Sequence, residues 1–262
     1  MKSGVGMYWS EAQKVSERAL SSGELMPIAT KALQITEGGV TYFVHIATAN
    51  AGKKLAATTV QANPFKPYEA MLYVGDAGAQ HVCLLNKFPV LSPHLLICSK
   101  DFISQSTLLA NSDFEAWLLG FDRDDVLGFY NSGPIAGASQ AHRHMQLVRT
   151  SIPLNDVICH RQLPFESFLY EFESLQADRL YQGYMDALQQ LELIKNDGIH
   201  CYPHNILLTA KWMLIVPRST NNVEGIFANG LNYSGRFLVK RKEQLAWLQQ
   251  FGLMKYLTVC SR

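Results

Sequence analysis

Two histidines and a glutamine at alternate positions are the residues of this sequence best suited to chemistry. His142, His144 and Gln146 follow a loop of small residues, within residues 131–148. Side chains two positions apart in a β-strand point to the same face of a sheet. A strand here would therefore present two imidazoles and an amide on one surface, at the mouth of the loop.

The loop before this strand has the composition of an anion-binding turn. Gly133, Gly137 and Ala138 let the backbone turn tightly and come close to a ligand. Successive N–H groups in such a turn form a concave nest for anions. The predicted substrate contacts of this loop are Asn131, Ser132, Gly137, Ala138, Ser139 and Gln140. Together with the histidines they predict a site for chemistry on a phosphate.

A neutral imidazole is a good nucleophile toward phosphorus. Its unperturbed pKa of about 6.5 leaves most of it unprotonated at neutral pH. Attack would form a nucleotidyl-histidine, which divides one difficult transfer into two easier steps. Gln146 can donate and accept hydrogen bonds but cannot carry a proton, so we expect it to hold a phosphoryl oxygen or to orient His144.

The run Gly-Pro-x-x-Gly-Ala-Ser-Gln-x-His-x-His-x-Gln, which begins at Gly133, resembles the active-site motif of the diadenosine tetraphosphate phosphorylases, or ATP adenylyltransferases. These enzymes belong to the histidine-triad superfamily, in which Gln in place of the third His resembles the transferases rather than the hydrolases. The resemblance implies that His144 is the nucleophile. It also implies that His142 helps to fix the His144 ring and assists the leaving group.

Segments of the N-terminal half resemble the substrate-binding part of the same family. Asn86, just past an apolar strand, is expected to bond both hydroxyls of a ribose, and Lys87 to reach a phosphate. Lys53 and Lys54 fit a phosphate-binding loop of the family, and Lys54 is the favoured candidate. His94 resembles a family histidine near the site, but beside so apolar a run we interpret it as a core residue. The histidines interpreted as structural are His45, His81, His160, His200 and His204.

The C-terminal part resembles the family along residues 202–219 and 225–240. The substrate contacts that this implies are Asn229, Gly230 and Leu231, through backbone and amide groups, and Lys240, through its charge. For Arg218, a local structural pairing and a phosphate role are equally open.

Three residues depart from the family pattern. Ala141 stands where Pro is usual, so the loop has less built-in rigidity. Arg143 replaces a common Lys, which matters little if the side chain faces away from the site. Arg236 stands where an apolar residue is common, and this leaves the distal-phosphate pocket and the preferred dinucleotide open.

Composition favours a globular enzyme. The chain has 262 residues, of which 48% are hydrophobic and 17% charged, and its formal net charge is +1. Nothing in this balance indicates a nucleic-acid or membrane surface. No run has the length of a transmembrane helix or the form of a signal peptide. The five scattered cysteines suit free thiols in a reducing compartment and make a zinc site improbable. We therefore predict a cytoplasmic location.

Hydrophobic periodicity predicts an α+β protein with an antiparallel sheet. Expected helices cover residues 10–23, residues 112 toward 130, residues 177–198 and residues 242–250, the first two opened by capping boxes at Ser10 and Ser112. Expected strands cover a hairpin at 28–46 and residues 72–74, 81–85, 95–98, 142–149, 205–208 and 212–216, with a loop at 47–63. The resemblance adds a histidine-triad half-barrel with helices packed outside. Residues 1–262 are predicted to form one catalytic domain, with the nucleophile in half 1–150 and an ATP-adenylyltransferase-like half at 160–262.

The predicted function is phosphorolysis of diadenosine tetraphosphate to ADP and ATP through an adenylyl-histidine, with inorganic phosphate as the acceptor. A divalent cation, Mg²⁺, would arrive with the polyphosphate, without a metal site in the protein and without an organic cofactor. The alternatives are a nucleotide-sugar phosphorylase or another nucleotidyltransferase of the superfamily, a hydrolase that uses water, and a non-catalytic nucleotide sensor. An intact His-x-His-x-Gln argues against the sensor. The base and chain-length preference, the use of sulfate and the oligomeric state stay open.

Overall fold

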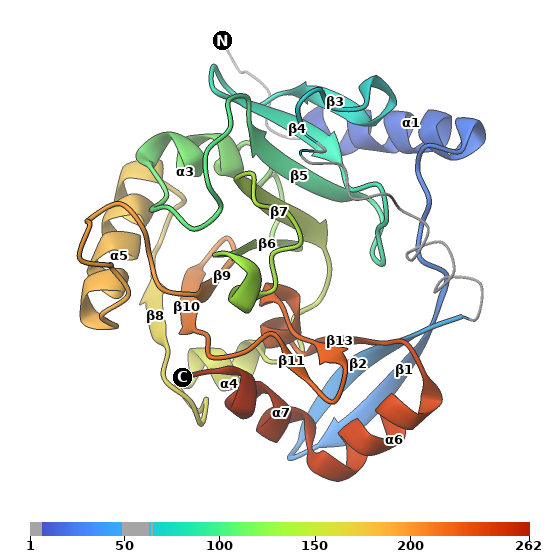
Figure 1. Cartoon of the computed structure of the whole chain (residues 1–262), viewed down its shortest axis with the longest axis vertical. Coiled ribbons are helices and arrows are strands. Elements are labelled where there is room, and N and C mark those ends of the chain that lie inside the picture. The colour runs from blue at the N-terminus through green and yellow to red at the C-terminus, as the bar shows by residue number, and fades with distance from the viewer. Residues whose placement is uncertain (1–6, 49–62, 64) are drawn as a thin grey trace.

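An eight-stranded antiparallel sheet runs through the molecule and holds the motif strand near its middle (Figure 1). The computed structural model describes residues 7–48, 63 and 65–262. In spatial order the strands are β3 (Tyr73–Asp76), β4 (His81–Leu85), β5 (His94–Ser99), β7 (His144–Arg149), β6 (Val126–Asn131), β9 (His204–Leu208), β10 (Trp212–Pro217) and β8 (Phe168–Glu171). Every neighbouring pair is antiparallel, so the predicted α+β class with an antiparallel sheet is confirmed.

A smaller sheet joins the two ends of the chain. The hairpin of β1 (Thr30–Glu37) and β2 (Val40–Ala47) is the predicted one, and its turn glycines have φ of 58° and 81°. The third strand, β13 (Arg236–Val239), comes from the C-terminal part and runs parallel to β2. A short hairpin of β11 (Asn222–Val223) and β12 (Ile226–Phe227) precedes it.

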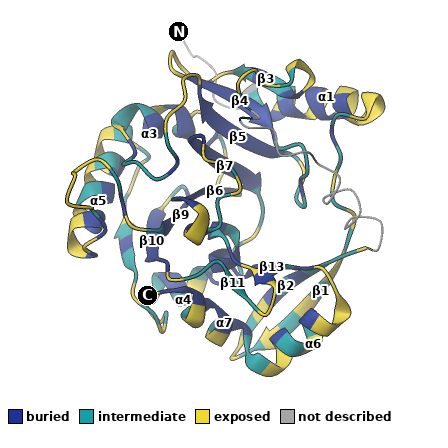
Figure 2. Ribbon diagram, in the orientation of Figure 1, coloured by how far each residue is buried: buried dark blue, intermediate teal, exposed yellow. Residues whose placement is uncertain are grey.

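Helices cover one face of the large sheet. They are α1 (Met7–Ser22), α3 (Asn111–Leu118) and α5 (Ala177–Gln190), of which α3 and α5 pack side by side (Figure 1). The other helices are α4 (Asn155–Cys159), α6 (Lys242–Phe251) and α7 (Leu253–Cys260), and the last two lie beside the smaller sheet. The six inner strands of the large sheet are buried almost throughout, whereas the edge strands β3 and β8 are only partly buried (Figure 2).

Alternate residues of the motif strand face two different cores. Met145 and Leu147 belong to the core beneath α1, α3 and α5. Val148 belongs to a second core, which the large sheet shares with β2, β13, α6 and α7. Because side chains alternate along a strand, His144 and Gln146 share the face of Val148. The motif side chains therefore lie on the sheet face opposite α1, α3 and α5.

Two of the predicted helices are wrong over part of their length. The helix expected from Ser112 toward Tyr130 ends at Leu118, and residues 126–131 form β6 in the centre of the sheet. Its N-terminal cap is different too, because the carboxylate of Asp113 accepts the N–H of Ala110 at 2.7 Å. Local sequence patterns could not show that residues 126–131 are held between two strands.

The other helix corrections concern ends. The helix expected over residues 177–198 ends at Gln190, and Glu192 then adopts a φ of 51°. Ser10 lies inside α1, which begins at Met7, so it is not the N-cap. Helix α7 and strand β8 were not expected. The predicted loop at residues 47–63 lies almost entirely outside the described residues.

Gly128 in the middle of β6 makes room for two aromatic rings. A Cβ there would lie 2.9 Å from both Phe121 and Trp117. We expect Gly128→Ala to lower the free energy of unfolding by about 1–3 kcal/mol, because overpacking forces strained side chains. Gly75→Ala is the control, because its Cβ would meet Tyr8 at an ordinary 3.6 Å. Urea unfolding compares the two, and equal losses would contradict the expectation.

Candidate active site

His144 is a buried, neutral imidazole with one ring nitrogen available. Its Nδ1 lies 2.8 Å from the carbonyl oxygen of His142. A carbonyl oxygen can only accept, so Nδ1 carries the proton and Nε2 carries the lone pair. Burial lowers the pKa of His144 to about 4. The ring of Phe65 packs against it, with centroids 5.4 Å apart. At neutral pH this geometry provides an unprotonated Nε2 with a fixed direction.

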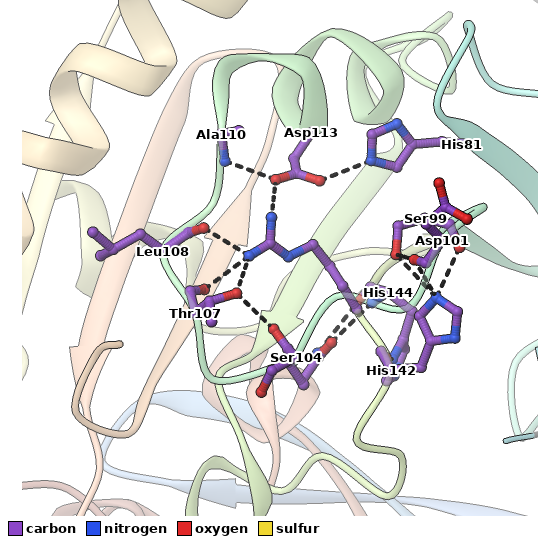
Figure 3. Close-up of polar contacts among 12 residues, drawn as sticks. His81, Ser99, Asp101, Ser104, Thr107, Leu108, Ala110, Asp113, His142 and His144 are labelled. Carbon is purple, nitrogen blue, oxygen red and sulfur yellow. Dashed lines mark hydrogen bonds and ion pairs between the residues drawn. The ribbon is translucent and has the colours of Figure 1, made fainter. Parts of the chain in front are cut away.

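The His142 ring anchors the main chain that holds His144. Its Nε2–H points at the carbonyl oxygens of Ser99, at 2.8 Å, and Asp101, at 3.0 Å (Figure 3). Its Nδ1 lies 3.0 Å from the side chain of Asn63. Burial also lowers the pKa of His142. The group that orients the His144 ring is therefore the main-chain carbonyl of His142 and not its imidazole. The predicted assistance of His142 to a leaving group stays a prediction.

Gln105 clamps the main chain of His144, and no pattern in the sequence indicates this role. Its Oε1 accepts the N–H of His144 at 2.8 Å, and its Nε2 donates to the carbonyls of His144 at 3.2 Å and Asn131 at 2.8 Å. The pairing of β6 with β7 ends at Phe129 and Gln146. Beyond that pair, the buried amide of Gln105 stands between the two strands. It therefore replaces a strand partner where the anion loop leaves the sheet.

A buried ion pair lies behind the motif. Arg143 donates through Nη1 to Asp113 at 2.7 Å and through Nη2 to the carbonyl of Leu108 at 2.7 Å. The second Asp113 oxygen lies 2.8 Å from Nε2 of His81 (Figure 3). Arg143 does face away from His144, as predicted, but it is not an incidental residue. Removing one member would leave the other charge buried without its partner, which destabilises proteins by about 3–5 kcal/mol.

The anion loop has the predicted backbone, but only some of its predicted donors are free. Gly133 and Gly137 have φ of 78° and 93°, which glycine adopts readily. The N–H groups of Gly137 and Ala138 donate to carbonyls of the loop itself at 2.9 and 3.1 Å, so they are not free for an anion. Within the described part of the chain, Ser139 and Gln140 make no hydrogen bond through side chain or N–H. Ser139 and Gln140 therefore have donors available for an anion.

The C-terminal segment packs against the anion loop, as predicted. A Cβ on Gly137 would lie 2.5 Å from the carbonyl of Ala228, so only glycine allows this approach. The N–H of Gly230, the first residue of η3 (Gly230–Ser234), donates to Oδ1 of Asn131 at 2.7 Å. The N–H groups that bond inside the protein here are those of Asn229, Gly230 and Leu231. These N–H groups are therefore already bound, and the substrate contacts of the three residues stay a prediction.

Arg218 is a structural cation. It is 4% exposed, and it donates to the carbonyls of Cys260 at 2.8 Å and Thr220 at 2.6 Å and to Oδ1 of Asn205. Cys260 is the last residue of α7, where the helix dipole favours a positive charge. The local pairing is thus the one observed. Arg236 is also bound locally, to Ser151 at 3.0 Å.

Asn86 and Lys87, expected to bind ribose and phosphate, both have partners in the protein. Lys87 Nζ lies 2.7 Å from the carboxylate of Glu69. Asn86 bonds the N–H of Phe88 and the ring of His94. Their substrate contacts stay predictions, but each would have to share or exchange these bonds.

The remaining predicted contacts are scattered. Lys240 is exposed, with Nζ 5.1 Å from the ring of Phe227. Ser132 is buried, and its Oγ lies 3.1 Å from Sγ of Cys201. The phosphate-loop candidates Lys53 and Lys54 lie outside the described residues. In the part of the chain that is described, no helix could span a membrane and no group of three His, Cys, Asp or Glu residues could hold a metal ion.

Two family models match the chain. The Ap4A phosphorylase N-terminal domain matches residues 2–171, and the ATP adenylyltransferase C-terminal domain matches residues 161–262. Among curated proteins, the chain is 31% identical over 231 residues to diadenosine 5',5'''-P1,P4-tetraphosphate phosphorylase 2 of Saccharomyces cerevisiae, covering 70% of each. It is 26% identical over 219 residues to protein APA1 of the same organism, covering 68% of each.

Solved structures show the same fold. The yeast Ap4A phosphorylase Apa2 in complex with Ap4A superimposes with a TM-score of 0.82 at 24% identity, covering 97% of each chain. The complex of Apa2 with AMP gives a TM-score of 0.80 at 25% identity, covering 97% of this chain and 96% of that one.

The Gln105 clamp predicts a loss of stability on its removal. Gln105→Met keeps the side-chain length but leaves the N–H and C=O of His144 unpaired in a buried place. An unsatisfied buried group costs about 1–3 kcal/mol. We expect a loss of that size in urea unfolding, whereas the exposed control Gln182→Met should change stability by less than about 0.5 kcal/mol. A Gln105 variant as stable as the control would show that the clamp is not needed.

Three buried histidines predict acid sensitivity. Burial lowers the pKa of His94, His144 and His204 to about 4. Unfolding returns each to about 6.5, so the unfolded state binds more protons between these two pH values. The free energy of unfolding should fall as the pH falls through this window, by up to about 1.4 kcal/mol per pH unit for each histidine. Urea unfolding at several pH values measures this slope.

The variant His204→Phe supplies the control for this slope. The ring of His204 packs against Tyr130 and Tyr184, and among the described residues its one side-chain hydrogen bond is the one it donates to the carbonyl of Tyr202. Its replacement should reduce the slope by up to about 1.4 kcal/mol per pH unit, because one of the three histidines with a pKa of about 4 is gone. An unchanged slope would mean that buried histidines do not cause the acid sensitivity.

Proposed function

The chain belongs to the Ap4A phosphorylase family, and on this basis we propose that it catalyses the phosphorolysis of diadenosine tetraphosphate, Ap4A, to ADP and ATP. The observation that carries the proposal is the state of His144. It is buried and neutral, and its Nδ1–H is bound to a carbonyl of its own motif, so Nε2 is the nucleophilic atom.

In the first step, Nε2 of His144 attacks the α-phosphorus of one AMP unit. The bond from that phosphorus to the bridging oxygen breaks, and ATP leaves. The N–H groups of Ser139 and Gln140 and the amide of Gln146 are the donors that we assign to the charge developing on the phosphoryl oxygens. Their support is that Ser139 and Gln140 have no other hydrogen-bond partner among the described residues.

In the second step, inorganic phosphate attacks the adenylyl-histidine. The phosphorus–nitrogen bond breaks, ADP leaves, and Nε2 of His144 regains its lone pair. We propose phosphate rather than water as the acceptor because the loop that leads to His144 keeps the N–H groups of Ser139 and Gln140 without a partner among the described residues, and such donors suit an anion.

The cation and the location are further parts of the proposal. Mg²⁺ is expected to arrive bound to the polyphosphate, because it prefers phosphate oxygens and water to an all-protein cage. There it would neutralise charge on the leaving triphosphate. A cytoplasmic location is supported by five cysteines that are all free thiols, as in proteins of reducing compartments.

The test is intact-protein mass spectrometry after a brief incubation with Ap4A in the absence of phosphate. The wild-type protein and the control His160→Ala, which changes an exposed histidine, should gain the mass of one adenylyl group. His144→Ala should gain none, because its nucleophile is gone. Added phosphate should discharge the group as ADP.

Other outcomes would change the proposal. An adenylyl group on His144→Ala would place the nucleophile elsewhere. Release of AMP in place of ADP would indicate water as the acceptor. A wild-type protein that binds Ap4A without gaining mass would be a nucleotide sensor.

A further inference from the structure

A line of three hydrogen bonds leads from the end of β4 to the amide next to the nucleophile. The N–H of Phe88 lies 3.0 Å from Oδ1 of Asn86. Nδ2 of Asn86 lies 3.1 Å from Nδ1 of His94, and Nε2 of His94 lies 3.0 Å from Oε1 of Gln146. Gln146 is two residues from His144 on the same strand face.

The first bond decides the direction of the others. A backbone N–H can only donate, so the Asn86 atom facing Phe88 must be the oxygen, and its NH₂ must face His94. An NH₂ group can only donate, so Nδ1 of His94 must be the acceptor. A neutral imidazole carries one proton, which is then on Nε2 and faces Gln146. Gln146 must therefore meet His94 with its oxygen and turn its NH₂ away, toward the site.

We propose that Asn86 and His94 are positioning residues, which hold the Gln146 amide with its NH₂ toward the phosphoryl group that His144 attacks. This inference rests on the proposed function and adds to it the orientation of the Gln146 side-chain amide. Phosphoryl oxygens only accept hydrogen bonds, so an amide turned the other way would present a repelling oxygen to them. His94, which the sequence suggested was a core residue, becomes the central link.

The surroundings of His94 suit a fixed neutral tautomer. The side chain is 9% exposed, and the ring of Phe129 on β6 packs beside it with centroids 5.6 Å apart. Within the described part of the chain, the one titratable group that acts on it is His144 on β7, and Asn86 at the end of β4 is uncharged. Burial lowers the pKa of His94 to about 4, so the second ring proton stays off at neutral pH.

The main chain of Gln146 is held by a separate contact, which leaves its side-chain amide free for this role. Its main-chain oxygen accepts from Nε1 of Trp117 at 3.1 Å, and this fixes the backbone from the helix side of the sheet. In the part of the chain described, Nε2 of Gln146 donates to no other residue. One half of the amide is thus bound to His94, and the other half is available to the substrate.

The direct test is the tautomer of His94 in the ligand-free, full-length protein. Two-bond ¹H–¹⁵N NMR of the imidazole rings distinguishes protonated from unprotonated ring nitrogens, and a His94→Gln spectrum assigns the signal. We expect a neutral ring with its proton on Nε2 throughout the range from about pH 5.5 to about pH 8. A proton on Nδ1, or a mixture of both tautomers, would overturn the proposal.

The functional test is the variant Asn86→Asp. The new carboxylate still accepts the N–H of Phe88, so the turn is kept, but it cannot donate to His94. His94 must then protonate Nδ1. At low pH the imidazolium still donates through Nε2 and Gln146 keeps its orientation. As the pH rises the ring loses its Nε2 proton, and the Gln146 amide turns its oxygen to the site.

The expected result is therefore a pH profile that the wild-type protein does not have. At saturating Ap4A, the single-turnover rate of adenylyl transfer in Asn86→Asp should fall by about 100-fold as the pH rises. Asn222→Asp is the control, because Oδ1 of Asn222 also accepts a turn N–H, that of Gly225, but contacts no histidine. It should follow the wild-type profile.

The outcomes separate this inference from the proposed function. If the pH profiles of the adenylyl-transfer rate are parallel for Asn86→Asp and wild type, Asn86 and His94 do not position Gln146, even if adenylyl transfer occurs. A wild-type protein that forms no adenylyl-histidine would overturn the proposed function, while the NMR experiment would still decide the tautomer of His94. The NMR result also stands if Asn86→Asp does not fold.

Discussion

The site depends on keeping one buried imidazole uncharged. Nε2 of His144 is nucleophilic because burial disfavours its protonated form and because Nδ1 is committed to the carbonyl of His142. Such a ring is aimed at a ligand only if the groups around it are already held in position. The neighbouring structure supplies these contacts from three sides: the Gln105 clamp on the main chain, the His142 ring on the end of β5, and the line of bonds that ends at Gln146.

Side chains of the motif strand have a role on each face of the large sheet. His144 and Gln146 point to the face that carries the site, while Arg143 points to the other and pairs with Asp113 near the start of α3. Desolvation makes such a pair expensive unless its hydrogen bonds are complete, and Asp113 accepts from Arg143, His81 and the N–H of Ala110. The helix face thus holds the backbone from which the nucleophile projects, so stability and reactivity share one strand.

Residues close in sequence were predicted well, and contacts across long separations were not. Alternation placed His144 and Gln146 together, and the glycines at 133 and 137 do have left-handed φ. The N–H groups expected to bind an anion at Gly137 and Ala138 are instead used inside the loop, because a tight turn closes its own hydrogen bonds. Gln105 left no signal, since a buried glutamine looks like any surface glutamine in a sequence. His94 was taken for a core residue because its partners, Asn86 and Gln146, become visible only when β4, β5 and β7 lie side by side.

The sequence by itself determined the chemistry: a loop of small residues, two histidines and a glutamine with the spacing of one strand face, and an antiparallel α+β fold. These follow from local rules, namely the period of a strand and the conformational freedom of glycine. Only the tertiary structure decided which nitrogen of each ring carries its proton, which N–H groups are free, and which cations are bound inside the protein. A proton's position depends on the donor or acceptor that faces it. For His94 the partners come from other strands, and for His144 the partner is the carbonyl of His142, which the backbone brings within 2.8 Å of Nδ1.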